Sequence, residues 1–184
     1  VLIGSTEASN CLMLSSGVHG VEGFAGSAIQ ISILEQLKSA PDNTALAFIH
    51  AVNPYGMAWL RIVNESNVDL NRNMLLPDEE YSGEPTGYAT LSPLINEKKE
   101  PQKRDGFMRR ALWFVMKNGF SRTKQAFAEG QYERPRCLQY GGDKMEKGPS
   151  LLLEWLKANL NHTRRCVWID LHTGLGKPGI DSLL

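Results

Sequence analysis

The stretch that most constrains the fold of this chain is Ser15–Gly23, with the sequence Ser-Ser-Gly-Val-His-Gly-Val-Glu-Gly. It follows the apolar run Cys11–Leu14, which predicts a short buried strand, and it precedes a helical pattern that begins near Phe24. Between strand and helix lie His19 and Glu22, three residues apart in a glycine-rich loop. An imidazole and a carboxylate in this position can converge on one cation, and zinc accepts such nitrogen and oxygen donors.

Two other interpretations of this loop are open. A dinucleotide-binding turn also has the order strand, glycine-rich loop and helix. The glycines recur at every third residue, however, which misses the G-x-G-x-x-G spacing, and no G-K-[ST] follows. The second alternative is a tight structural turn in which His19 and Glu22 are ordinary polar residues, and so short a pattern does not exclude it.

Apolar runs alternate with helical patterns along the chain. The strands that we expect cover residues 11–16, 44–52 and 166–171. The helices that we expect cover residues 24–38, 106–118, 121–129 and 150–160, with an interruption at Asn118-Gly119 and with Ser150 as a cap. In the first helix the predicted apolar face consists of Phe24, Ala28, Ile31, Leu34 and Leu37. The polar stretches 76–105 and 130–149 predict long loops, with at most short helices in the first.

Strands separated by helices indicate an α/β fold with a mostly parallel (mixed) sheet and helices on both faces. The 184 residues, 42% of them hydrophobic, can bury a core as a single domain over residues 1–184. The 20 basic and 20 acidic residues balance, so no global charge indicates nucleic acid or a membrane as a partner. Three widely spaced cysteines favour free thiols in a reducing compartment, and we expect a cytoplasmic protein.

Polar residues follow each of the three predicted strands. His19 follows the first, Asn53 the second and His172 the third. Because ligands of open α/β sheets bind beyond the carboxyl ends of the strands, these groups are expected to gather at one edge. His172 is therefore a plausible third metal ligand. His50, placed inside the second strand, and His162, in a polar turn, are expected to be structural.

Five short motifs, in this order along the chain, resemble the zinc carboxypeptidase superfamily. They are His19-x-x-Glu22, Asn53-Pro54-x-Gly56, Arg61, Asp69-x-Asn71-Arg72 and Asp170-x-His172. The longer words SSGVHGVEGFAGS, NPYGMAWLR, NVDLNRN and IDLHTGLG resemble the DUF2817 branch, which is related to succinylglutamate desuccinylase and aspartoacylase. The resemblance extends from about residue 11 to residue 180.

The resemblance implies roles for seven residues. His19, Glu22 and His172 match zinc ligands, and Asp69 matches the acid that hydrogen-bonds a ligand histidine, His19 in this chain. Arg61 matches the arginine that polarises the scissile carbonyl, and Asn71 with Arg72 matches the pair that binds a substrate carboxylate. Without the resemblance, Asp69 is an ordinary Asx-turn acid and both arginines are solvated loop charges.

The function that the resemblance implies is a zinc-dependent hydrolase that cleaves an amide bond next to a free carboxylate. A deacylase of N-acyl amino acids and a metal-binding domain without turnover are the alternatives. Similar proteins carry their general-base glutamate on a strand well after the third ligand, whereas only twelve residues follow His172 and Asp181 is the one acid among them. We therefore expect an incomplete domain, truncated at its carboxyl end, that binds metal but hydrolyses little.

Overall fold

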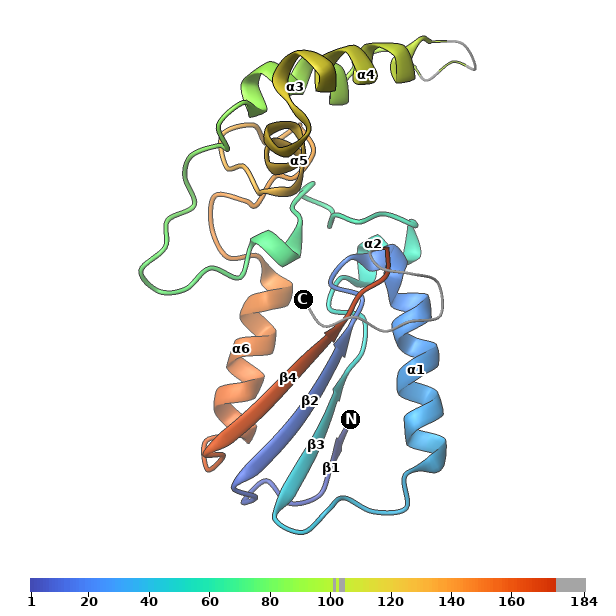
Figure 1. Ribbon diagram of the computed structural model, residues 1–184. Helices are drawn as coiled ribbons and strands as arrows, with labels where there is room; N and C mark the ends of the chain where they lie inside the picture. The colour runs from blue at the N-terminus through green and yellow to red at the C-terminus, as the bar shows by residue number, and fades with distance from the viewer. Residues whose placement is uncertain (101, 103–104, 175–184) are drawn as a thin grey trace. The chain divides into compact units, whose positions relative to one another are not determined.

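The computed structural model describes residues 1–100, 102 and 105–174 (Figure 1). The chain forms two compact units. The first unit comprises Val1–Ser66 together with the described residues from Lys147 onward, and the second comprises Asn67–Glu146. The second unit is thus an excursion from the first, which the chain leaves at Ser66 and re-enters at Lys147.

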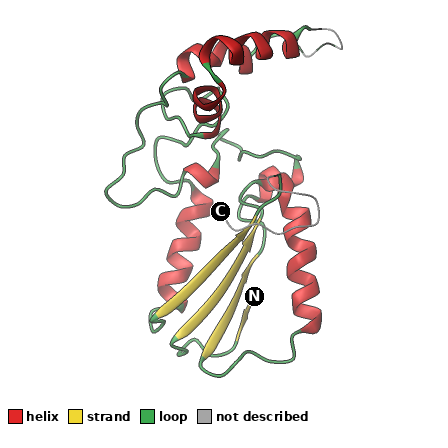
Figure 2. Ribbon diagram, viewed as in Figure 1, coloured by secondary structure: helices red, strands yellow, loops and turns green. Residues whose placement is uncertain are grey.

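The first unit is built on a four-stranded mixed sheet, drawn in yellow in Figure 2, with the strand order β1-β3-β2-β4. Its strands are β1 (Leu2–Ile3), β2 (Asn10–Ser16), β3 (Thr44–Ile49) and β4 (Arg165–Leu171). β2 pairs in parallel with both β3 and β4, and β1 pairs antiparallel with β3. The α/β class and the parallel arrangement of the three predicted strands are confirmed. The strand β1 was not predicted, because two residues are too short to show a period.

Two long helices cover opposite faces of this sheet, α1 (Gly23–Gln36) and α6 (Lys147–Asn159) (Figure 1). Successive residues of a strand point to opposite faces, so each strand contributes to two cores. One core contains Cys11, Met13, Ala45 and Ala47 with Trp155 and Leu156 of α6. The other contains Leu14, Leu46 and Phe48 with Ile33 and Leu34 of α1. Helices on both faces were expected, and the two cores confirm this.

The predicted apolar face of α1 is partly wrong. Phe24 and Ile31 are exposed, whereas the buried residues of this helix are Gly23, Gly26 and Gln30. Gly26 lies so close to β2 that a Cβ atom there would come within 2.5 Å of the Cβ of Ser16. The helix therefore approaches the carboxyl end of the sheet through its small residues, which an apolar periodicity does not reveal.

Two boundaries near the second predicted strand differ from expectation. β3 ends at Ile49 rather than at residue 52, so His50 lies outside the strand and is exposed. Ala51 has a φ of 52°, a backbone conformation that a strand does not contain. Residues 50–52, expected to be strand, lead instead into a short helix, α2 (Pro54–Ala58), whose N-cap residue Asn53 accepts a side-chain hydrogen bond from the Gly56 N–H.

The second unit contains the helices α3 (Tyr88–Ile95), α4 (Phe107–Asn118) and α5 (Phe120–Ala128) and the one-turn helix η2 (Leu70–Arg72). The predicted interruption between α4 and α5 is confirmed at Gly119, which has a φ of 85°. Beyond this unit, α6 begins at Lys147, so Ser150 lies inside that helix and the predicted cap is wrong. None of the helices in the described part of the chain combines the length and apolar character needed to cross a membrane.

Candidate metal centre

The loops that follow β2 and β4 bring His19, Glu22 and His172 together. Because β2 and β4 are parallel neighbours, with Ser16 opposite Leu171, the chain leaves both strands at the same edge of the sheet. One potential ligand atom from each of the three side chains lies within 4.8 Å of the other two. The two imidazole rings meet edge to face, with 4.9 Å between their centroids.

The Glu22 carboxylate lies between the two histidines. Its Oε1 atom is 3.2 Å from Nδ1 of His19, and its Oε2 atom is 3.1 Å from Nδ1 of His172. The backbone N–H of Thr173 donates a further hydrogen bond to Oε2. Both histidines thus present the same ring nitrogen, Nδ1, to the carboxylate, and the cluster is an arrangement of two imidazole nitrogens and one carboxylate oxygen.

The electrostatics of the cluster favour charged forms. Burial alone would raise the pKa of Glu22, but the hydrogen bonds from His172, His19 and Thr173 outweigh it and hold the pKa well below its usual range. The hydrogen bonds of His172 to Asp170 and Glu22 raise the pKa of its ring to about 10. A metal ion bound here would replace the proton on the imidazole nitrogen that faces Glu22.

Gly20, in the middle of the loop, is explained by close packing against residues 56–62. The N–H groups of Gly20 and Val21 donate to the carbonyl oxygens of Ile62 and Arg61, respectively. A Cβ atom on Gly20 would lie 2.1 Å from the backbone carbon of Gly56, so no other residue fits there. At this position the glycine therefore serves contact between two backbones.

Two buried amides hold the strand ends in place. Asn53 donates to the carbonyl oxygen of Ile62 and accepts from the N–H of Gly56, so this strand-end residue is a structural clamp. Gln30 of α1 donates to the carbonyl oxygens of Leu14 and Ile49 and accepts from the hydroxyl of Ser16. Sequence reasoning missed Gln30, although a glutamine on the same side of the helix as Gly23 and Gly26 was a usable signal.

Arg61 belongs to the same unit as the cluster. Its carbonyl oxygen accepts the hydrogen bond from the N–H of Val21, the residue before Glu22, and its own N–H donates to the carbonyl oxygen of Gly56. The side chain is exposed. The backbone thus anchors Arg61 beside the loop that carries two of the three potential ligands.

Asp69, Asn71 and Arg72 belong to the second unit, where they form a local network. Asp69 is buried, and its carboxylate accepts hydrogen bonds from the backbone N–H of Asn71 and from the Arg72 guanidinium. Arg72 also donates to the carbonyl oxygen of Ala128, at 2.6 Å. The first of these contacts is the Asx turn that local sequence predicts for Asp69, and the roles that the resemblance implies for the three residues stay predictions. Asp181 lies outside the described residues.

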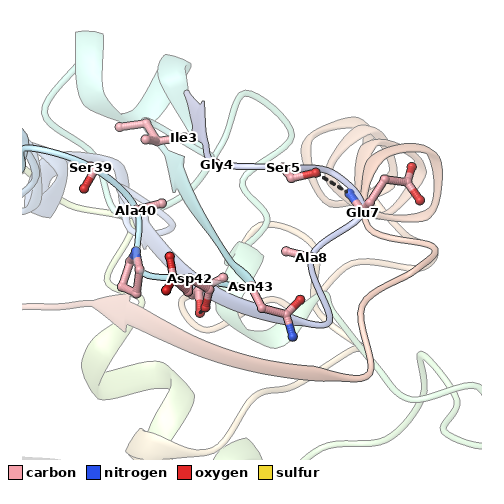
Figure 3. A pocket seen from close by; sticks show the side chains of 11 residues that line it. Ile3, Gly4, Ser5, Glu7, Ala8, Ser39, Ala40, Asp42 and Asn43 are labelled. Carbon is pink, nitrogen blue, oxygen red and sulfur yellow. Dashed lines mark hydrogen bonds between the residues drawn. The ribbon is translucent and has the colours of Figure 1, made fainter.

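A pocket of about 560 Å³ lies at the opposite end of the sheet (Figure 3). Its lining comes from the segments that precede β2 and β3, including Ser5, Glu7, Asp42 and Asn43. The sticks in Figure 3 show the Ser5 hydroxyl accepting a hydrogen bond from the backbone N–H of Glu7. Since His19 and His172 follow the carboxyl ends of their strands, this pocket is separate from the candidate metal centre.

Taken together, the α/β fold and the cluster at its strand ends define a candidate metalloprotein. The chain matches the model of the family described as a protein of unknown function (DUF2817) over residues 1–184, and it belongs to that family. No curated protein and no solved structure matches it.

Proposed function

We propose that this protein is a zinc-dependent hydrolase that cleaves an amide bond next to a free carboxylate. The observation that carries the proposal is the convergence of His19, Glu22 and His172 from two neighbouring strand ends. Two imidazole nitrogens and one carboxylate oxygen form a donor set that catalytic zinc sites use, with a further position left for water or substrate. The deprotonated state of Glu22 also fits, because a carboxylate must lose its proton to bind a metal.

In this proposal the residues of the chain have three roles: metal binding, stabilisation of developing negative charge and binding of the substrate carboxylate. His19, Glu22 and His172 would hold zinc, which lowers the pKa of bound water towards about 7 and polarises a carbonyl. Arg61, anchored beside the loop through Val21, would donate to the oxygen on which negative charge develops. Asn71 and Arg72 would bind the substrate carboxylate, as the resemblance to zinc carboxypeptidases implies.

Metal content tests the site directly. The purified protein should bind about one zinc ion per chain, as a three-donor site with one open position does. His19→Ala should abolish this binding, because two remaining donors do not make a comparable site. His50→Ala is the matched control, since His50 is exposed and lies outside the cluster. Full zinc occupancy in His19→Ala would remove His19 from the site.

Hydrolysis assays separate the candidate activities. Zinc-loaded protein should be offered dipeptides and N-acyl amino acids, in parallel with the chelated protein. Cleavage of dipeptides indicates a carboxypeptidase-like enzyme, and cleavage of N-acyl amino acids alone indicates a deacylase. Zinc binding without turnover on either class would fit both a metal-binding domain and the lack of a general-base glutamate that the sequence predicts, and a longer natural chain assayed in parallel separates the two.

Amidated substrates test the role of Arg72. If Arg72 binds a carboxylate, Arg72→Lys should weaken substrate binding by about 1.5–3 kcal/mol, as for a hydrogen bond to a charged group. Amidation of the substrate should then impair the wild type far more than the variant. Arg134→Lys is the matched control, because Arg134 also pairs with a carboxylate in the second unit, that of Glu84. Equal penalties in wild type and Arg72→Lys would assign Arg72 another role.

A further inference from the structure

The two ring nitrogens of His172 have different partners. Nδ1 is 3.1 Å from the Glu22 carboxylate, inside the cluster of potential ligands. Nε2 is hydrogen-bonded to Oδ2 of Asp170, two residues earlier in the chain. Each ring nitrogen thus donates to a carboxylate in this structure. Nδ1 is the nitrogen that faces the other potential ligands, so a metal ion would replace its proton while Nε2 keeps its hydrogen bond to Asp170.

Asp170 is itself held in place by a directed chain of hydrogen bonds. The indole N–H of Trp168, which can only donate, lies 2.7 Å from Oγ of Ser15. The hydroxyl of Ser15 donates in turn to Oδ1 of Asp170, at 2.5 Å. Both carboxylate oxygens are thus engaged, Oδ1 by Ser15 and Oδ2 by His172, so the orientation of the carboxylate is defined.

The register of the sheet explains why these groups meet. Ser15 of β2 lies opposite Asp170 of β4, and Met13 lies opposite Trp168. Trp168 and Asp170 are two residues apart, so their side chains project from the same face of β4. Ser15 is fully buried near the carboxyl end of the central strand β2, which keeps water from competing for its hydroxyl.

We infer that Asp170 is a positioning residue for His172, and that Ser15 and Trp168 support it by fixing its carboxylate. The inference rests on the proposed zinc site. Carboxylates that accept the second ring N–H of a ligand histidine fix its tautomer and raise its basicity, and their loss weakens metal affinity roughly 10- to 100-fold. This role is distinct from that of Asp69, which the resemblance pairs with His19.

Zinc affinity tests the inference without any assay of activity. Dissociation constants should be measured for the whole chain by competition with a chromophoric chelator. Asp170→Asn should weaken zinc binding about 10- to 100-fold, because an amide lacks the charge and one of the two acceptor oxygens. Ser15→Ala should weaken it by a smaller factor, about threefold to tenfold, since it acts through Asp170.

Ser16→Ala is the matched control. Ser16 is the next residue of β2, is equally buried and donates to Gln30 instead of Asp170. It should leave zinc affinity unchanged even where it lowers the free energy of unfolding. If Asp170→Asn does not fold, the zinc affinities of Ser15→Ala and Trp168→Phe test the same inference, with smaller expected changes.

The tautomer of His172 supplies a readout that a merely structural role would not change. Long-range proton–nitrogen NMR spectra of the zinc-loaded wild type should show His172 protonated at Nε2 and metal-bound at Nδ1. In Asp170→Asn this preference should weaken. A wild type that binds no zinc would overturn both the proposed function and this inference. Wild-type affinity and an unchanged tautomer in Asp170→Asn would overturn the inference alone.

Discussion

The two units of the chain are held together in different ways. The sheet of the first unit buries apolar side chains on both faces, and its buried polar residues lie near the carboxyl ends of the strands, where Ser15, Ser16 and Asn53 are. In the second unit, by contrast, the largest buried side chains include the amides Gln131 and Asn73. Apolar clusters on a sheet therefore organise the first unit, while in the second unit side-chain hydrogen bonds to the backbone act together with buried apolar residues such as Tyr88 and Leu91.

The buried amides of the second unit replace regular secondary structure. The Asn73 side chain donates to the carbonyl oxygens of Gly141 and Lys144 and accepts from the N–H of Glu146. Gln131 similarly closes the turn that runs to Leu138. Buried backbone groups must find partners, and in loops without a strand or helix ladder the side chains supply them. Loss of one such amide should thus affect several backbone groups at once.

The largest effect should come from a cavity in the sheet of the first unit. Met13 is buried in the central strand β2 and packs on the α6 side. Met13→Ala should lower the free energy of unfolding by about 2–5 kcal/mol, as large-to-small core substitutions do. Urea denaturation measures the change. Val167→Ala on the neighbouring strand is the control, because Val167 is half exposed and should change stability by about 0.5 kcal/mol or less.

The next largest effect should come from Asn73 in the second unit. Asn73→Ala removes the partner of two carbonyl groups and one N–H, and it should destabilise this unit by about 3 kcal/mol. Hydrogen exchange should accelerate around residues 141–146 while amides of β2 and β3 keep their protection. Asn118→Ala is the control, since Asn118 bonds a single carbonyl group within its own helix. Equal hydrogen-exchange rates in Asn73→Ala and Asn118→Ala would contradict the conclusion that buried amides stabilise the loops of the second unit.

Gln30 tests whether the first unit also depends on an amide. Gln30→Ala removes donors from the carbonyl oxygens of Leu14 and Ile49, and it should lower the free energy of unfolding by about 2 kcal/mol. Gln36→Ala on the same helix is the control, because Gln36 is exposed and bonds only to Ser32 among the described residues. If Gln30→Ala changes the free energy of unfolding as little as Gln36→Ala does, the hydrogen bonds of Gln30 contribute little to the stability of the first unit.

The smallest effect should come from the Tyr88 hydroxyl, which donates to the carbonyl oxygen of Leu138. Tyr88→Phe should lower the free energy of unfolding by about 1 kcal/mol at neutral pH. Burial raises the pKa of Tyr88, so the folded state favours the protonated phenol. Its contribution is present below the ordinary tyrosine pKa of about 10 and is lost as the pH rises through the raised value. The wild type should therefore lose more stability than Tyr88→Phe above about pH 10, and parallel pH profiles would contradict this.

Local patterns in the sequence determined three of the four strands, most of the helices in the described part of the chain and the potential ligands. The three apolar runs predicted β2, β3 and β4, and Gly119 predicted the interruption between α4 and α5. His19 and His172 could be placed at one sheet edge because parallel strands share the direction in which they end. These features depend on periodicity and on strand direction, which neighbouring residues encode.

Tertiary structure alone decided which polar groups meet outside the cluster of potential ligands. The face of α1 that approaches the sheet is set by Gly26 and Gln30, against the apolar periodicity. Asp170 finds Ser15 across 155 residues of sequence, and Asn73 finds the segment 141–146 across about 70. A hydrogen bond requires its two atoms to lie within about 3 Å of each other. Residues this far apart in the sequence meet only when the chain folds, so no local pattern predicts these contacts.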